Sequence, residues 1–334
     1  MKHTQRQEEL NFINKTKPIL EPLMHFQSKL CQKLYPTCFE EKFDTFEIST
    51  ERLSALFTDF AQNMLKNQEF KSDFLNILSN KHPNVVVKFI TDPKHPKFHE
   101  AASTGRIEQH QVGNQLFFHE EIGKTAIVCP LGKQTSPNTI ETDMEKLAAL
   151  VHEIFHATSE KHIGPKFISP NTHAVGEIEG IFGEKLFFEY LKKHVSTLPN
   201  FLNVNLSPEW FKLQEEKHAK NINIRLAKDL HTFLSTTHKE NKFYRFRYIV
   251  GHVFLPHLVD AYHTNPEFAM KQFNEFRKRN SHMDLNDATA ALTDGAFTTA
   301  QSMIGIYKLE KIDELKEKTQ GKCDERDLHD TENY

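Results

Sequence analysis

The residues His152, Glu153 and His156 form the pattern His-Glu-x-x-His, the part of this sequence best suited to chemistry. On an α-helix, side chains four residues apart lie one above the other on the same face. His152 and His156 can therefore offer two imidazoles to one metal ion. Glu153 follows His152 directly and can reach a water molecule bound to that ion. The pattern predicts two zinc ligands and a general base.

The alternative interpretation of this pattern is a coincidental pair of surface histidines. The chain has 20 His in 334 residues, so the pattern arises by chance in roughly one such chain in ten. The flanking sequence nevertheless favours a helix, which Thr142 or Asp143 could cap. Apolar residues recur there mostly at spacings of three and four: Met144, Leu147, Ala148, Val151, Phe155 and Ala157.

A second helix, from about 174 to 193, offers a third ligand. Glu177 and Glu184 share one of its faces, whereas Glu179 is expected to point elsewhere. The 20 residues between His156 and Glu177 suffice for a loop with Gly and Pro and an antiparallel return. Two histidines, one glutamate and one open position make a catalytic zinc site, since structural sites close all four positions. The alternative for Glu177 alone is a solvated helix glutamate.

Another group of polar residues begins at His238 and continues through the run from Phe243 to His252. On a helix, Tyr244 and Tyr248 share a face. Tyr and His beside a zinc site can donate hydrogen bonds to the oxyanion that develops when a carbonyl is attacked. Tyr248, Tyr244 and His238 are therefore candidates for oxyanion or substrate contacts. The alternative is a set of aromatic core positions with basic residues on the outer face.

The segment from Glu177 to Glu184, E-I-E-G-I-F-G-E, resembles the one that carries the third zinc ligand in the oligoendopeptidase F and thimet oligopeptidase family. In that family the ligand glutamate is followed three residues on by a small residue and seven on by another glutamate. The resemblance implies that Glu177 is the third ligand, Gly180 the small residue and Glu184 the second acid. Phe155 is a departure, because the family usually has Gly before the second histidine.

The run after His238 extends this resemblance. The family carries a His followed five residues later by F-Y-x-Y-x-Y-x-x-G, which contributes substrate-binding and transition-state groups. Phe246 stands where the family has Tyr, so one hydroxyl is missing. Arg245 and Arg247 are further departures, which could bind a substrate carboxylate or lie in solvent. The positions that match are His238, Phe243, Tyr244, Tyr248 and Gly251.

The resemblance covers about residues 140–260. Full-length members of the family are considerably longer, and a large helical half closes over a channel that admits only short peptides. Here the part before the metal helix is short, which suggests a more open cleft. A folded protein then becomes conceivable as a substrate.

The expected fold is mainly α with a small antiparallel β-sheet, and the catalytic domain resembles the gluzincin type. Residues 1–82 are expected to form an N-terminal helical cap, 83–317 the zinc metallopeptidase domain and 318–334 a polar tail. The domain is expected to contain a sheet within 83–131 and the active-site helices within 141–193. Its C-terminal helices are placed at 209–219, 222–236, 243–263, 266–279 and 285–317.

The sheet is expected from β-branched and apolar runs. Residues 84–91 predict one strand, and 114–121 with 124–131 predict a hairpin around Ile122-Gly123. The segments 92–113 and 133–140 are expected to be loops. Thr125 to Cys129 is the candidate edge strand for a substrate backbone, although a purely structural strand fits equally well.

Composition narrows the function further. The formal net charge of −3 gives no general field that favours nucleic acid or a membrane surface. The four Cys form no C-x-x-C pair, which favours a reducing compartment. The first residues lack the apolar core of a signal peptide, so we expect a cytoplasmic protein, with export by a non-classical route left open. Its oligomeric state is not predicted.

The sequence therefore favours a zinc metallopeptidase that hydrolyses a peptide or protein substrate, with one Zn²⁺ per chain. Two alternatives remain open at this point. One is a zinc carboxypeptidase on a related scaffold. The other is a non-catalytic protein that keeps zinc structurally or binds a partner.

Overall fold

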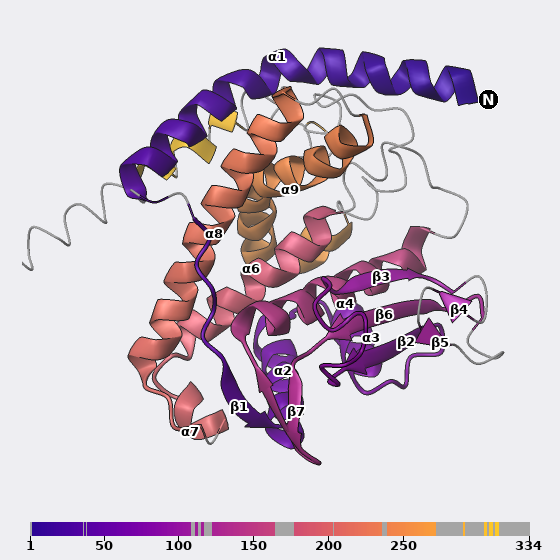
Figure 1. Ribbon diagram of the computed structural model, residues 1–334, viewed down its shortest axis with the longest axis vertical. Coiled ribbons are helices and arrows are strands. Elements are labelled where there is room, and N and C mark those ends of the chain that lie inside the picture. Colours follow the sequence, from indigo (N-terminus) through magenta and orange to yellow (C-terminus); the bar gives the residue numbers. More distant parts are fainter. Residues whose placement is uncertain are drawn as a thin grey trace, which may run out of the picture.

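The computed structural model is largely helical (Figure 1). The residues that it describes are 2–35, 37, 39–107, 111–112, 115–116, 122–163, 177–202, 204–235, 239–271, 290, 304–305, 307–309 and 311–313. The helices are α1 (Lys2–Leu34), α2 (Thr50–Met64), α3 (Gln68–Leu78), α4 (Met144–Ile163), α6 (Glu177–Lys193), α7 (Leu198–Leu202), α8 (Pro208–Ser235) and α9 (Lys239–Thr264). The strands are β1 (Phe46–Ser49), β2 (Val85–Ile90), β3 (Ser103–Arg106), β4 (Gln111–Val112), β5 (Gln115–Leu116), β6 (Thr125–Pro130), β7 (Lys133–Ser136) and β8 (Thr139–Thr142).

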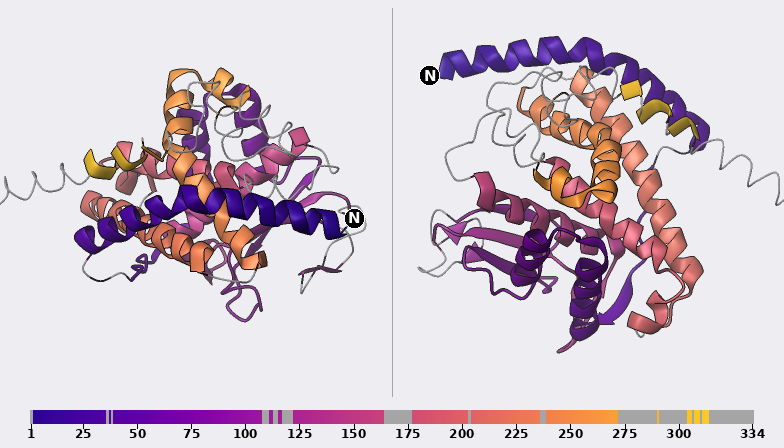
Figure 2. Two further views of the ribbon diagram at one scale, coloured as in Figure 1. Left: turned by 90° about the horizontal axis from the view of Figure 1, so that it is seen from above. Right: turned by 180° about the vertical axis from the view of Figure 1, so that it is seen from behind.

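Phenylalanine dominates the core that holds these helices together. Phe60 of α2 is fully buried and meets the rings of Phe187 and Tyr190 of α6 edge-on. Phe74 of α3 is also fully buried and contacts Phe155 of α4. Rings of this size remove much apolar surface from water. They fix α2 and α3 on the side of α4 and α6 that the rear view in Figure 2 shows.

Two three-stranded sheets accompany the helices. One has the order β2-β6-β3, with β6 parallel to β2 and antiparallel to β3. The other has the order β1-β8-β7 and is antiparallel throughout. The expectation of a mainly α fold with a small sheet is confirmed, but the first sheet contains a parallel pair.

The predicted hairpin partner of β6 was wrong. β6 lies between β2 and β3, so Thr125 to Cys129 is a central segment and not the expected edge strand. Residues 92–113, expected to be a loop, contain β3 and β4, and β4 pairs with β5. β3 has the sequence Ser-Thr-Gly-Arg, which lacks apolar alternation, so its strand depends on pairing with β6. Residues 117–121 lie outside the described part of the chain.

Two other local expectations are corrected. Residues 133–140 form β7 and the start of β8. Within β8, Ile140 and Thr142 are buried whereas Thr139 and Glu141 are partly exposed, the alternation of a half-buried strand. The helices expected at 209–219 and 222–236 are the single helix α8. It continues through Asn221 because that side chain bonds the backbone carbonyl of Glu41, 2.8 Å away, instead of its own helix.

The long helix α1 lies across α8 (Figures 1 and 2). Gln27 of α1 is fully buried and donates to the backbone carbonyl of Asn223 at 3.0 Å. The large core cluster takes residues from α1, α2, α3, α4, α6, α8 and α9. This one core contains residues from both sides of residue 82. The division of the chain into a cap and a catalytic domain stays a prediction. Most of 266–317 and all of 318–334 lie outside the described residues.

Among the described helices, none combines the length and the apolar character that crossing a membrane requires.

Candidate metal centre

Helix α4 carries His152 and His156 one turn apart. Asp143 caps its start, since the Asp143 carboxylate accepts from the Lys146 amide at 2.9 Å. The apolar residues between and before the histidines are fully buried, and these include Leu150, Val151 and Ile154. This buried stripe anchors the helix in the core. The two imidazoles are therefore fixed one turn apart on the same face of the helix.

Helix α6 begins at Glu177 and crosses α4 closely enough to place that carboxylate beside both histidines. The close approach depends on glycine. A Cβ at Gly180 would lie 2.2 Å from Nε2 of His152, and one at Gly183 would lie 2.7 Å from Cγ of Phe155. Any larger residue at Gly180 would therefore occupy the place of the imidazole.

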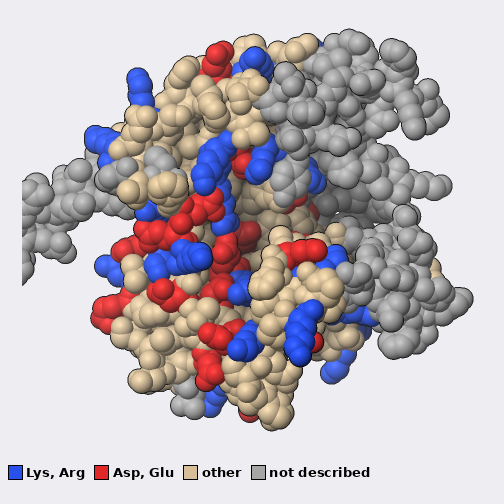
Figure 3. All heavy atoms as spheres, viewed as in Figure 1, with Lys and Arg blue, Asp and Glu red and all other residues tan. Residues whose placement is uncertain are grey.

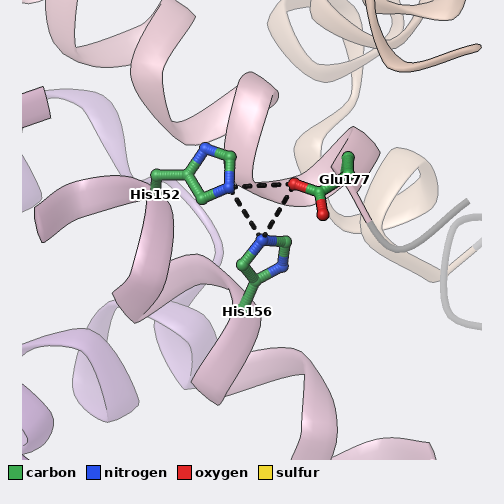
Figure 4. Close-up of side chains that lie close together, drawn as sticks. All are labelled: His152, His156 and Glu177. Carbon is green, nitrogen blue, oxygen red and sulfur yellow. Dashed lines mark hydrogen bonds and ion pairs between the residues drawn. The ribbon is translucent and has the colours of Figure 1, made fainter. Parts of the chain in front are cut away.

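The three side chains converge from the two helices (Figure 4). Nε2 of His152 lies 2.8 Å from Nε2 of His156 and 3.2 Å from Oε2 of Glu177. Nε2 of His156 lies 3.6 Å from the same oxygen. One ligand atom from each residue falls within 4.8 Å of the other two. Two imidazole nitrogens and one carboxylate oxygen facing a common point are a donor set suited to zinc.

Each histidine has a second carboxylate at its other ring nitrogen. Nδ1 of His152 lies 2.6 Å from Oε1 of Glu184, and Nδ1 of His156 lies 3.8 Å from Oε2 of Glu179. Histidines that bind metals commonly donate their second nitrogen to a carboxylate, which fixes the ring and its tautomer. The expectation that Glu179 points elsewhere was wrong. The first turn of α6 packs so closely on α4 that Glu179 reaches the far nitrogen of His156 while Glu177 faces both histidines.

These carboxylates change the proton affinity of the site. Burial alone lowers the pKa of His152, but hydrogen bonds with Glu177 and Glu184 outweigh it and raise that pKa well above 6.5. Burial and the neighbouring His152 lower the pKa of His156, yet Glu177 and Glu179 raise it to about 9. Burial acts to raise the pKa of Glu177, and the two histidines hold it far below its usual range. The arrangement favours positive charge between these residues.

Glu153, the expected general base, is 8% exposed. Burial, followed by the negative charge of Glu153, raises the pKa of the Cys129 thiol on β6. The backbone carbonyl of Glu153 accepts from Oγ1 of Thr104 at 3.2 Å. This hydrogen bond holds strand β3 next to Glu153.

Of the remaining residues expected at the site, the structure describes the side chain of Tyr248 on helix α9 but not those of Tyr244 and His238. Tyr248 is half-buried and packs against the main core. The side chain of Tyr244 and the whole of His238 lie outside the described part of the structure. Phe246 is 1% exposed, and its ring contacts Phe233 of α8. Phe246, at the position where the resemblance led us to expect Tyr, therefore fills the contact between α8 and α9.

Three residues near the site were not assigned to it from the sequence. Nη1 of Arg247 lies 3.4 Å from Oε1 of Glu177. Burial lowers the pKa of His252 to about 4 and that of His218 to about 3, although the charge of Glu184 opposes the shift in both. The position of Arg247 could have been inferred from the sequence, because Arg247 lies one helical turn before Gly251, and a glycine within a helix can mark the face that packs closely against another helix. At Gly251 an added Cβ would meet Ile181 at 2.4 Å, which shows how closely α9 approaches α6.

A hollow is visible on the face drawn in Figure 3, between the helices that include α9 and the part that contains β3. Charged side chains of both signs line its walls.

No family model matches the sequence, and no curated protein matches it. Solved structures do. The crystal structure of a "putative oligoendopeptidase F from Bacillus anthracis str. Ames" aligns with 91% of this chain and 55% of its own, at a TM-score of 0.52 and 10% identity. PZ peptidase A with an inhibitor aligns with 92% and 58%, at 0.49 and 11% identity. The chain thus has the fold of the first structure and spans little more than half its length, which confirms the fold expected from the motifs.

Proposed function

We propose that this chain is a zinc-dependent peptidase in which Glu153 acts as the general base. The observation that carries the proposal is the convergence of His152, His156 and Glu177, with Glu153 adjacent on the same helix. The shared fold with an oligoendopeptidase F structure supports it. Zn²⁺ is the metal that two imidazoles and a carboxylate suit best, and His152, His156 and Glu177 would hold it.

Zinc in this position would activate a water molecule and polarise the carbonyl of a peptide bond. Glu153 would accept a proton from the attacking nucleophile and pass it to the leaving amine. Glu184 and Glu179 would keep the two imidazoles oriented. Tyr248 and Tyr244 remain candidates for oxyanion or substrate contacts, together with His238.

The substrate backbone is proposed to pair with β3. In the described part of the sheet, β3 has a strand on one side only, and its Thr104 is bound to the backbone of Glu153. An extended peptide added to such an edge gains main-chain hydrogen bonds. β3 therefore replaces Thr125 to Cys129 in this role.

The test is Glu153→Gln, with wild-type and variant proteins loaded with zinc and incubated with a peptide library and a folded protein. We expect Glu153→Gln to bind zinc like the wild type and to lose at least about a hundredfold in cleavage rate, the scale of general-base catalysis. Mass spectrometry of the products shows whether cleavage is internal or terminal. Glu145→Gln, on the exposed first turn of the same helix, is the matched control and should cleave normally.

Cleavage that survives Glu153→Gln would show that the general base was assigned wrongly. Zinc binding without cleavage of any peptide by the wild type would favour a non-catalytic zinc protein.

A further inference from the structure

Two arginines of α9, Arg245 and Arg247, have different partners. Nη1 of Arg245 lies 2.8 Å from Oδ1 of Asp229 on α8. Nη1 of Arg247 lies 3.4 Å from Oε1 of Glu177 at the start of α6. Side chains two residues apart on a helix point in different directions. One arginine thus connects α9 to α8, and the other reaches the proposed metal centre.

The two oxygens of Glu177 have different neighbours. Oε2 faces Nε2 of both His152 and His156, whereas Oε1 faces Arg247. The side chain of Glu177 is 10% exposed and that of Arg247 is 23% exposed. Water screens a charge pair in such a setting less than at an open surface. The contact therefore restrains how the carboxylate can rotate.

We propose that Arg247 is a positioning residue that holds Glu177 as a ligand through one oxygen. The inference rests on the zinc site proposed above. By engaging Oε1, Arg247 leaves Oε2 directed at the point where the two imidazoles converge. It also supplies a positive partner for a carboxylate that must stay ionised to bind a cation. Hydrogen-bonded ligand carboxylates are a general feature of metal sites.

The packing of α9 supports this role. Gly251 lies one helical turn after Arg247, and a Cβ there would fall 3.7 Å from the backbone of Glu177. The bare backbone at Gly251 lets α9 approach the first turn of α6. The guanidinium of Arg247 then reaches the carboxylate through Nη1. Its planar shape and fixed donor directions are not reproduced by a lysine ammonium.

The experiment compares zinc affinity in wild type, Arg247→Gln and Arg247→Lys, by competition with a chromophoric chelator. The visible absorption spectrum of the cobalt-substituted proteins reports ligand geometry independently of activity. We expect Arg247→Gln to bind zinc about 10- to 100-fold more weakly, as is usual when a partner of a ligand is removed, and to show an altered cobalt spectrum. Arg247→Lys should recover part of both properties. Arg245→Gln, the matched control on the same helix, should match the wild type.

Wild-type zinc affinity and an unchanged cobalt spectrum in Arg247→Gln would overturn the role of Arg247 and leave the zinc site standing. Failure of the wild type to bind either metal would instead refute the proposed function, and the positioning role with it. Circular dichroism establishes that each variant is folded. If Arg247→Gln does not fold, Arg247→Lys decides: an affinity and spectrum equal to those of the wild type overturn the proposal.

Discussion

His152 and His156 each lie between two carboxylates, Glu177 on one nitrogen and either Glu184 or Glu179 on the other. Spacing along one helix was enough to predict the pair of histidines from the sequence, and Glu177 was expected from a second helix and from the family resemblance. Spacing was not enough for Glu179, because a helical wheel does not show where a crossing helix lies. Glu184 and Glu179 were both candidates from the sequence for partners of the histidines, and the crossing of α4 and α6 shows which carboxylate lies at which ring.

The raised histidine pKa values predict how zinc binding depends on pH. In the metal-free protein the pKa of His156 is raised to about 9 and that of His152 lies well above 6.5. Their Nε2 atoms lie 2.8 Å apart, so one nitrogen donates and the other accepts, and the pair shares one extra proton near pH 7. Zinc binds neutral imidazole and must displace this proton. Apparent zinc affinity should therefore rise with pH up to about 9, by about tenfold per pH unit for each proton displaced.

Titration calorimetry in two buffers of different ionisation enthalpy counts the protons released. We expect about one near pH 7. Release of none, together with an affinity that does not change with pH, would contradict the proton occupancy inferred for the two histidines.

At the scale of elements, glycine determines how closely α4 and α6 pack. Gly180 faces the imidazole of His152, and Gly183 faces the ring of Phe155. Phe155, the departure from the family noted in the sequence, is 1% exposed and meets Phe70 and Phe182 edge-on. It fills the space between α3, α4 and α6, where it contacts other aromatic rings. The sequence revealed the substitution, but only the crossing shows why a large ring is accommodated there.

Gly180→Ala and Gly183→Ala form a matched pair. Both add one methyl group to a tight crossing, which should cost about 1–3 kcal/mol of stability. Only Gly180→Ala displaces a metal ligand, so it should also abolish zinc binding, whereas Gly183→Ala should retain it. Thermal unfolding and zinc content measure the two effects. Equal zinc content in both variants would show that Gly180 does not control the site.

At the scale of the whole molecule, the sequence predicted helices around a small sheet but not how the strands pair. β6 was recognisable from its own residues, whereas its partner β3 has no strand pattern. Pairing between distant segments depends on contacts that local patterns do not contain. For the same reason the sequence suggested a boundary near residue 82, although β1 pairs with β8 and Phe60 and Phe74 lie fully buried in the shared core.

The fragment 83–334 should therefore fail to fold alone. Each large aromatic ring lost from the core costs about 3–5 kcal/mol, against a typical total of about 5–15 kcal/mol. Losing Phe57, Phe60 and Phe74 together would cost about 9–15 kcal/mol, which is comparable to that whole stability. Circular dichroism and thermal unfolding of the fragment test this. A cooperative transition with a native-like helical spectrum would show instead that residues 1–82 are a dispensable cap.

The most direct test of the central claim is the metal content of the purified protein, measured by elemental mass spectrometry. We predict about one zinc ion per chain, lost in His156→Ala and kept in His231→Ala, which removes an exposed histidine of α8. The absence of tightly bound zinc after reconstitution at neutral pH, or its retention in His156→Ala, would contradict the account.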